Sequence, residues 1–332
     1  MKTIVVIVTY GNRFCFLEKV INSVFDEGIQ KIIVIDNNSV EESRMKLKEY
    51  EDKNKEKIKV VYLDDNYGSA GGFKRGLQEA YNDNNCDFIW LLDDDNTPKK
   101  GAYIALVDFW EKNKMNKHKN ILISLRKDRR VYFDSIKYDD PEILIGKPNS
   151  FMQFDILEYL KNKFRKRDED DSFLFGKNYG ESYQAPYGGM FLNKKLIDII
   201  GYPNEKFFLY TDDTEYSYRV IQNDGKIYVV LNSLIEDIDT SWQNTSNKNF
   251  FSLPVLDTEF DFRVFYSFRN RTFFEIKNRV NNKFLYFLNM LIFLSFIFLF
   301  ALLRFDFKRF RLVCKATYDG LLGDLGKKED FN

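Results

Sequence analysis

Three consecutive aspartates, Asp93-Asp94-Asp95, directly follow the apolar run Phe88–Leu92. Carboxylates this close repel one another in a partly closed site, and a divalent cation removes that repulsion. If the extended geometry continues past Leu92, the side chains of Asp93 and Asp95 point to the same side and together hold Mg²⁺ or Mn²⁺, which keeps positions open for phosphate oxygens. The alternative interpretation is a solvated acidic turn before Pro98.

A second acidic cluster, Asp212-Asp213-Thr214-Glu215, follows Phe207-Phe208-Leu209-Tyr210. The dipole of a helix favours acidic residues in its first turn, so simple capping is one explanation. However, three carboxylates exceed what one helix start needs. An aspartate in a partly apolar pocket is a suitable general base for an alcohol nucleophile.

Three further segments are typical of turns when each is taken alone. They are Thr9-Tyr10-Gly11-Asn12-Arg13, Asp36-Asn37-Asn38-Ser39 and the glycine-rich stretch Asn66-Tyr67-Gly68-Ser69-Ala70-Gly71-Gly72-Phe73. The glycine-rich stretch has neither the GxxxxGK[ST] nor the GxGxxG spacing, but it opens a helix and lets backbone approach a ligand closely. If these segments converge with the acidic triplet, they indicate a site for a nucleoside diphosphate and a metal ion.

The elements that position these residues alternate in the first third of the chain. Short runs rich in Val and Ile predict strands at Ile4–Thr9, Lys31–Ile35, Lys59–Leu63 and Phe88–Leu92. Helices are predicted at Leu17–Phe25, Glu41–Glu56, Gly72–Tyr81 and Lys100–Trp110, with Pro98 near the start of the last. This alternation predicts an α/β fold with a mostly parallel sheet, helices on both faces, and all strand-end loops at one edge.

The pattern loosens after about Asn120 and returns at Pro186. We predict a strand at Gly188–Asn193, a helix at Lys194–Ile200, a helix at Asp213–Asn223 and a strand at Lys226–Ile235. The charge run Lys161–Asp171 lacks apolar periodicity and is interpreted as solvated.

The overall composition excludes several classes of protein. Lys and Arg number 50 and balance 50 Asp and Glu, which argues against a protein that coats nucleic acid. The three cysteines are too scattered for a disulfide framework or a Cys-based zinc site, and His118 is the only histidine. The N-terminal apolar run is too brief for a signal peptide, so we expect a cytoplasmic protein.

The C-terminal region has a different character. The segment 284–303 carries no charge, and only Asn289 and Ser295 interrupt it. Between Arg263 and Arg311, ten basic residues stand against two acidic ones. Such a segment can span a bilayer, lie along it with its cations on lipid phosphates, or pack inside a homo-oligomer. Because both flanks are basic, we expect a peripheral protein on the inner face of the membrane, with a span as the alternative.

Taken together, the chain resembles a family 2 glycosyltransferase of the GT-A fold from about Met1 to Trp242. The resemblance is carried by Val8-Thr9-Tyr10-Gly11-Asn12-Arg13, Ile35-Asp36-Asn37-Asn38-Ser39, Asn66-x-Gly68-x-Ala70-Gly71-Gly72-Phe73, Trp90-Leu91-Leu92-Asp93-Asp94-Asp95, Gly188-Gly189-Met190-Phe191 and Phe207–Glu215. It is nearest to bacterial galactofuranosyltransferases and rhamnosyltransferases. The motifs Tyr266-x-x-Arg269-Asn270-Arg271 and Asp319-Gly320-Leu321-x-Gly323-x-x-Gly326 are similar to their C-terminal regions.

This resemblance implies a role for each matching residue. Thr9 and Asp36 contact the nucleobase and ribose, and the glycine-rich stretch borders the donor sugar. The implied donor-binding set is Thr9, Tyr10, Arg13, Asp36, Asn38, Asn66, Gly71, Gly72 and Asp94. Asp93 and Asp95 hold Mn²⁺ or Mg²⁺ on the diphosphate. Asp213 is the base that deprotonates the acceptor hydroxyl, with Asp212 and Glu215 in support, and the reaction inverts the anomeric centre without a covalent intermediate.

One position departs from the family pattern. Many relatives carry a metal-binding histidine after the strand predicted at Lys226–Ile235, where this sequence reads Glu236-Asp237-Ile238-Asp239-Thr240. Asp237 lies nearest the expected position. As a hard oxygen ligand it suits Mg²⁺ or Mn²⁺, but it also adds negative charge beside a diphosphate. A third metal ligand and a plain polar strand end are therefore both open.

We therefore predict a GT-A domain over residues 1–242, with a donor half of about 1–120 and an acceptor half of about 180–242, followed by a helical region over 243–332. The predicted activity is the transfer of a galactofuranose- or rhamnose-type sugar from a UDP- or dTDP-linked donor to a glycan or lipid-linked acceptor in cell-surface polysaccharide synthesis. A nucleotidyltransferase is one alternative, although Arg13 is the only cation that its first loop offers. The other is a non-catalytic subunit with a degenerate transferase domain.

Overall fold

The computed structural model describes residues 1–127, 129–162, 176–239 and 260–329. By their contacts, the residues form two compact units. The first contains residues 1–144, 173–208 and 212–241, and the second contains residues 145–172, 209–211 and 242–332. The domain boundary predicted at residue 242 lies outside the described residues, as does nearly all of the charge run Lys161–Asp171.

Four parallel strands form one half of the sheet in the first unit. They are β1 (Thr3–Thr9), β2 (Ile32–Asp36), β3 (Ile58–Tyr62) and β4 (Phe88–Asp93), in the order β3-β2-β1-β4. Val8 of β1 pairs with Asp93 of β4, and Thr9 pairs with Asp36 of β2. This register brings the ends of β1, β2 and β4 to one edge, as the sequence predicted.

The other half of the sheet is mixed. β8 (Met190–Asn193) runs antiparallel to both β4 and β6 (Asn120–Leu125), and β6 is parallel to β9 (Lys226–Asp237). Two short strands, β7 (Tyr179–Ser182) and β5 (Asn96–Pro98), pair antiparallel with different parts of β9. Within the described residues the nine-stranded sheet is mixed: β1, β2, β3, β4, β6 and β9 run in one direction, in agreement with the predicted mostly parallel sheet, and β5, β7 and β8 run in the other.

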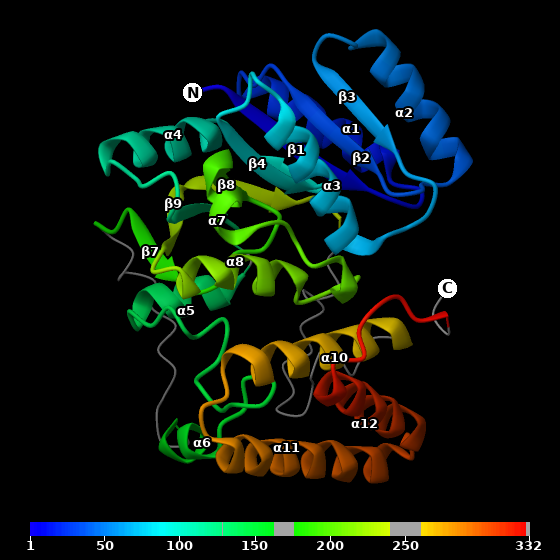
Figure 1. The fold of residues 1–332 in the computed structure, drawn as a ribbon, viewed down its shortest axis with the longest axis vertical. Helices are drawn as coiled ribbons and strands as arrows, with labels where there is room; N and C mark the ends of the chain where they lie inside the picture. The colour runs from blue at the N-terminus through cyan, green and yellow to red at the C-terminus, as the bar shows by residue number, and fades with distance from the viewer. Residues whose placement is uncertain (128, 163–175, 240–259, 330–332) are drawn as a thin grey trace. The chain divides into compact units, whose positions relative to one another are not determined.

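Helices cover both faces of this sheet (Figure 1). Alternate residues of β1 serve the two faces: Val5 and Ile7 pack with α1 (Phe14–Asp26), α2 (Glu41–Lys53) and α4 (Ala102–Lys112). Val6 and Val8 pack in a second core with α3 (Gly68–Asn82), α5 (Arg130–Lys137), α7 (Ile197–Ile200) and α8 (Asp212–Gln222). Both cores follow from the period-two alternation of side chains in a strand.

Several element boundaries differ from the prediction. Pro98 lies in β5, opposite Ile235, because a short edge strand tolerates a residue without an N–H group. Helix α4 starts only after Gly101, which has a φ of 88°. Helix α3 begins at Gly68 rather than Gly72, and the segment Lys194–Ile200 divides into a 3₁₀ turn over Lys194–Leu196 and α7. Strand β6 was not predicted.

The described part of the second unit contains α6 (Ile156–Asn162), α10 (Asp261–Asn278), α11 (Lys283–Arg304) and α12 (Phe307–Leu322). Asn282 caps α11 by accepting a hydrogen bond from the Leu285 backbone N–H. Asp306 caps α12 by accepting a hydrogen bond from the Arg309 backbone N–H. The apolar segment predicted at 284–303 is therefore one continuous helix.

The two C-terminal motifs pack on each other. A Cβ on Gly320 of α12 would lie 2.3 Å from the Arg269 carbonyl oxygen of α10, so only glycine allows this approach. The Arg269 guanidinium donates to the Gly326 carbonyl oxygen at 2.7 Å, and the Lys328 N–H donates to the Tyr266 hydroxyl at 2.9 Å. In this structure both motifs hold α12 against α10.

Candidate active site

The end of β2 is held by partners from its own unit. Asp36 is fully buried, and it accepts hydrogen bonds from the Ser39 N–H at 3.0 Å and from the Arg44 guanidinium at 2.5 Å. Arg44 also donates to the Leu63 carbonyl oxygen. Asn38 adopts a φ of 59°, which places it in the tight turn that the Asp36–Ser39 segment predicted. Arg44, which sequence reasoning missed, fixes the position of the Asp36 carboxylate.

The glycine-rich stretch is tied to β2 through Asn37. The side-chain Nδ2 of Asn37 donates to the Asn66 side-chain oxygen and to the Gly68 carbonyl oxygen. Its Oδ1 accepts a hydrogen bond from the Tyr67 backbone N–H. A Cβ on Gly72 would lie 2.6 Å from the side chain of Val8, so this glycine lets the first turn of α3 rest on β1. A Cβ on Gly71 would lie 2.4 Å from the Cβ of Tyr67. These glycines therefore set the path of the stretch at the sheet edge.

The acidic triplet does not continue as a strand. β4 ends at Asp93, and Asp94 and Asp95 lie in a turn, so the assumption of extended geometry is wrong for these two residues. The Asp94 side chain is only 4% exposed, and it accepts from the Thr9 hydroxyl at 2.8 Å and from Arg13 Nε at 2.8 Å. Burial raises the pKa of Asp94 to about 7, although Arg13 and Thr9 act against this rise.

Arg13 connects three carboxylates. Besides Asp94, its guanidinium contacts Asp95 Oδ2 at 3.0 Å and Asp239 Oδ2 at 2.6 Å. Burial acts to lower the pKa of Arg13, but the carboxylates outweigh it and the pKa is raised, so the group stays cationic. Tyr10 is half-exposed, with its ring 5.6 Å from the guanidinium.

Asp93 is the most open carboxylate of the triplet. Its side chain is 42% exposed, and Arg126 Nη2 lies 3.8 Å from its Oδ2. Burial, together with the nearby charges of Asp95, Asp237 and Asp94, raises the pKa of Asp93 to about 7, while Arg126 acts to lower it. Burial also raises the pKa of Asp95. Both groups therefore lie where an added cation stabilises the ionised form.

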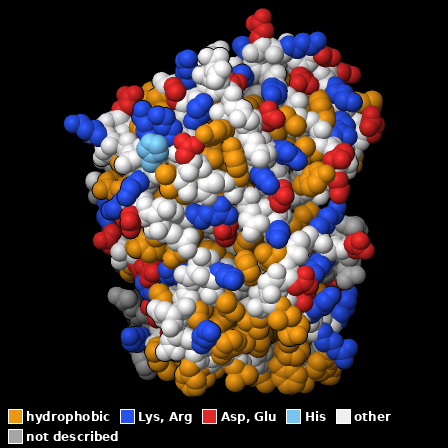
Figure 2. Space-filling view, in the orientation of Figure 1, with side chains coloured by type: hydrophobic (Ala, Val, Ile, Leu, Met, Phe, Trp, Pro, Cys, Tyr) orange, Lys and Arg blue, Asp and Glu red, His pale blue; other side chains and the backbone are white. Residues whose placement is uncertain are grey.

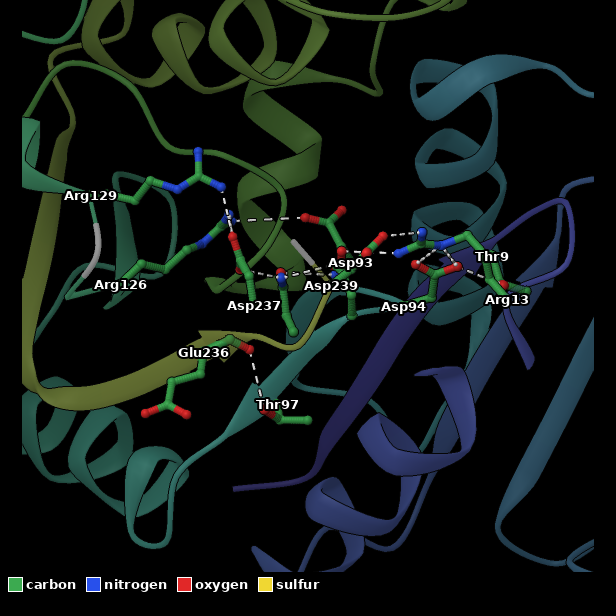
Figure 3. A network of polar contacts seen from close by, with 12 residues as sticks. Thr9, Arg13, Asp93, Asp94, Thr97, Arg126, Arg129, Glu236, Asp237 and Asp239 are labelled. Carbon is green, nitrogen blue, oxygen red and sulfur yellow. Dashed lines mark hydrogen bonds and ion pairs between the residues drawn. The ribbon is translucent and has the colours of Figure 1, made fainter. Parts of the chain in front are cut away.

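Asp237 is surrounded by donors (Figure 3). Asn96 Nδ2 donates to its Oδ1 at 2.8 Å, while Arg129 Nη2 and Arg126 Nη1 approach its Oδ2 at 2.7 and 3.5 Å. Its side chain is 6% exposed. Arg126 and Arg129 follow β6, the strand that the sequence did not predict, and sequence reasoning missed both.

The second acidic cluster begins α8. Asp212 is buried and accepts from the Ser69 hydroxyl at 2.7 Å, which links it to the glycine-rich stretch. Burial and the charge of Asp213 raise the pKa of Asp212 to about 8, and Asp93 contributes to that rise. Burial raises the pKa of Asp213, and Arg126 acts to lower it. The two acidic clusters therefore lie within electrostatic range of each other in the first unit.

Glu215 has a structural partner. It forms an ion pair with Arg219 one turn along α8, with Nη2 at 2.6 Å from Oε2. Arg219 also donates to the carbonyl oxygens of Ile200 and Tyr202. These contacts hold α8 to the end of α7.

Two aspartates of the acidic triplet are suitable oxygen ligands for a divalent cation. Among residues 1–127, 129–162, 176–239 and 260–329, no group of three or more His, Cys, Asp or Glu side chains has the geometry of a metal site. Magnesium-type ions in nucleotide sites often take one or two protein carboxylates and complete their shell with water and phosphate oxygens. Asp93 suits this arrangement best, because its side chain is 42% exposed. Asp95 accepts from Asn96 and Arg13 but is 22% exposed, whereas Asp237 accepts from Asn96 and Arg129 and is only 6% exposed.

Comparison with known proteins identifies part of the chain. Residues 4–154 match the family model of Glycosyl transferase family 2, which is fewer than half of the 332 residues. Among curated proteins, no match was found.

Solved structures share the fold. GalNAc-T7 with UDP, GalNAc and Mn²⁺ aligns at 16% identity with a TM-score of 0.53, over 82% of this chain and 47% of that one. The mannosyltransferase PcManGT from Pyrobaculum calidifontis, with GDP-Man and Mn²⁺, aligns at 9% identity and a TM-score of 0.49, over 82% and 62%. S. aureus TarS aligns at 14% identity and a TM-score of 0.48, over 80% and 42%.

The chain thus spans about half of the GalNAc-T7 structure. At these identities the structural likeness shows the fold alone, which is GT-A-like, with a mixed sheet covered by helices. The GT-A-like fold agrees with the family match over residues 4–154.

Proposed function

We propose that the protein is an inverting glycosyltransferase that uses a nucleotide-sugar donor. The observation that carries the proposal is the combination of two acidic clusters in one unit, Asp93-Asp94-Asp95 at the end of β4 and Asp212-Asp213 at the start of α8. The raised pKa of Asp212 and of Asp213 supports a role in proton transfer, because a base with a raised pKa binds the proton of an alcohol more strongly.

In the proposed reaction, Asp213 accepts the proton of the acceptor hydroxyl. At the same time the oxygen of that hydroxyl attacks the anomeric carbon of the donor. The bond from that carbon to the diphosphate breaks in the same step, and the diphosphate leaves with the electron pair, so the configuration inverts. Asp212 accepts a hydrogen bond from the Ser69 hydroxyl, and this contact holds its carboxylate at the start of α8, next to Asp213 in the chain. On the donor side of the proposed site, Asp94 accepts hydrogen bonds from Thr9 and Arg13 and so links these three residues.

Asp93 and Asp95 would hold the divalent cation, Mn²⁺ or Mg²⁺. When bound, the ion would neutralise charge on the leaving diphosphate. GalNAc-T7 was solved with Mn²⁺, which makes this ion the first to test.

The substrates follow from the sequence resemblance. We propose a UDP- or dTDP-linked donor with a galactofuranose- or rhamnose-type sugar and a glycan or lipid-linked acceptor in cell-surface polysaccharide synthesis. The complex of GalNAc-T7 with UDP makes UDP-sugars the first donors to test.

The experiment is a donor panel. The purified protein is incubated with UDP-, dTDP- and GDP-sugars and with Mn²⁺, Mg²⁺ or EDTA, and release of the nucleoside diphosphate is measured. We expect release from one donor class with Mn²⁺ and its loss with EDTA. Binding of the donor without release of the nucleoside diphosphate, with or without added acceptor extract, would contradict the proposal that the protein is an enzyme. It would favour the non-catalytic subunit. Release of pyrophosphate from a nucleoside triphosphate and a sugar phosphate would favour the nucleotidyltransferase.

We also propose that α11 lies on an anionic lipid surface at the inner face of the cell membrane. Its buried residues are Tyr286, Asn289, Phe293, Ile297 and Ala301, and the Asn289 amide donates to the Asn149 carbonyl oxygen. Its exposed side is apolar as well. The exposed apolar residues include Phe284, Phe287, Leu291, Phe298, Leu299 and Leu303. Figure 2 shows apolar side chains gathered over α11. Exposed cations, Lys283 and Arg304, lie at its two ends, where they can meet lipid phosphates.

Cosedimentation with liposomes tests this proposal. We expect the protein to bind vesicles that contain anionic lipid, more weakly at high salt, and Leu291→Asp to reduce binding about tenfold or more. Ile104→Asp is the matched control, because Ile104 is 54% exposed on α4 and Leu291 is 63% exposed on α11. Equal loss in both variants, or no binding by the unchanged protein, would refute the proposal. A fall in oligomeric mass with Leu291→Asp and no change in vesicle binding would instead assign the face to a second copy of the chain.

A further inference from the structure

Two arginines that follow β6 converge on the carboxylate that stands near the position of the family's metal-binding histidine. Arg126 and Arg129 point toward Asp237 in Figure 3, and Arg126 also faces Asp93. The Arg126 residue is 6% exposed and the Arg129 side chain is 20% exposed. A place where a metal ligand was expected therefore holds two positive charges around one negative charge.

Asp237 is poorly suited to bind a cation. Its Oδ1 accepts from Asn96, and its Oδ2 accepts from Arg129. A metal ion that took either oxygen would displace a buried donor, which costs free energy unless that donor finds another partner. The contacts instead give Asp237 the task of holding the two guanidinium groups in place.

Arg126 has donors that its protein partners do not use. Its Nη2 donates to the Gly188 carbonyl oxygen at 2.8 Å, and the contacts with Asp237 and Asp93 are long, at 3.5 and 3.8 Å. Its buried Nε has no hydrogen-bond partner among the described residues. A guanidinium carries five N–H donors in a planar fork that matches phosphate oxygens, so the partly satisfied group is suited to a phosphate.

We propose that Arg126 and Arg129 bind the terminal phosphate of the donor's diphosphate, and that Asp237 is a positioning residue for them rather than a metal ligand. This inference rests on the proposed function, because it assumes a nucleoside diphosphate beside Asp93. Negative charge develops on the terminal phosphate when the bond to the sugar breaks. Two fixed guanidinium groups stabilise that charge from the side of β6 and β9.

Comparison of nucleoside mono- and diphosphates tests the assignment. Binding of UDP, UMP, dTDP, dTMP, GDP and GMP is measured by calorimetry, with and without Mn²⁺, for the unchanged protein and for Arg129→Gln. Arg129 is the first choice because its side chain is more exposed than that of Arg126, so the variant is more certain to fold. We expect the diphosphate that binds the unchanged protein to lose about tenfold to a hundredfold in affinity, and its monophosphate to change less than twofold.

Two further variants separate charge from structure. Arg129→Lys keeps the charge and loses the fork, so we expect an intermediate loss. Lys226→Gln, which removes an exposed cation paired with Glu181 at the start of β9, should leave both affinities unchanged.

Asp237→Asn provides the readout for the metal. Mn²⁺ bound to the protein with nucleotide is counted by electron paramagnetic resonance, and Asp93→Asn is the comparison. We expect Asp237→Asn to keep Mn²⁺ within about threefold of the unchanged affinity and Asp93→Asn to lose it by more than tenfold. Equal losses of Mn²⁺, or equal losses of mono- and diphosphate with Arg129→Gln, would overturn the inference while leaving the proposed function intact. If no diphosphate binds the unchanged protein, the proposed function itself is wrong.

Discussion

Gly188 lets three polar side chains meet beside β8. A Cβ added to this residue would lie 2.0 Å from Asn96 Oδ1, 2.4 Å from Arg126 Nη2 and 2.5 Å from Asp93 Oδ2. Ordinary contacts with a methyl group are about 3.5 Å, so each of these atoms must retreat by about 1 Å or more in Gly188→Ala. All three atoms are ends of side chains, so the backbone of β8 can stay where it is.

The expected effect of Gly188→Ala therefore falls on function more than on folding. Overpacking of this kind costs about 1–3 kcal/mol in the free energy of unfolding. A displacement of about 1 Å in groups that position a substrate can lower the rate of transfer about a hundredfold. We expect transfer from the nucleotide sugar to fall by this factor, with loss of nucleoside diphosphate binding, while thermal unfolding stays cooperative.

A second glycine provides the matched control for this variant. Gly28 has a φ of 82° and open space around its Cβ position, so Gly28→Ala costs about 1–2 kcal/mol through backbone strain without touching these residues. We expect its transfer rate to equal that of the unchanged protein. Full activity in Gly188→Ala, or equal loss of activity in both variants, would show that the cluster around Gly188 does not form the donor site.

Two further variants test other contacts of the site. Ser69→Ala removes the hydroxyl that stabilises ionised Asp212, so Asp212 keeps its proton to higher pH and the neighbouring base Asp213, relieved of that charge, ionises more easily. The rise of the transfer rate with pH should therefore move lower by up to about 1 pH unit, and a shift to higher pH would contradict Asp213 as the base. Asp94→Ala removes the buried carboxylate that accepts from the Thr9 hydroxyl and from Arg13 Nε, although Arg13 keeps Asp95 and Asp239 as partners. Urea unfolding should show a loss of about 2–3 kcal/mol, and a loss below about 1 kcal/mol would show that these contacts do not hold the β1 and β4 ends together.

The donor half of the fold was predictable because its signals are local. Each of β1, β2, β3 and β4 is a short run rich in Val and Ile that ends in polar punctuation, and parallel pairing brings those ends to one edge. The acidic triplet was likewise found from residue type and position, and so was the helix predicted at Asp213–Asn223, which the structure has at Asp212–Gln222. Their electrostatic coupling arises only through the fold.

The features that the sequence did not predict depend on pairing between residues that are far apart in the chain. β5 is three residues long, and it exists because Asn96–Pro98 meet the far end of β9. β6 is a short apolar run in an otherwise polar stretch, and without it Arg126 and Arg129 had no element to place them. Their ion pairs with Asp237 join residues more than a hundred positions apart, for which the sequence carries no local signal.

The most direct test of the proposed enzyme is Asp213→Asn, measured for donor binding and for transfer in the same preparation. The substitution keeps the shape of the side chain and removes its capacity to accept a proton, so we expect nucleoside diphosphate affinity within about twofold and transfer reduced about a thousandfold or more. Full transfer by this variant would contradict the assignment of the base, and loss of donor binding in parallel with transfer would show that Asp213 serves the donor instead.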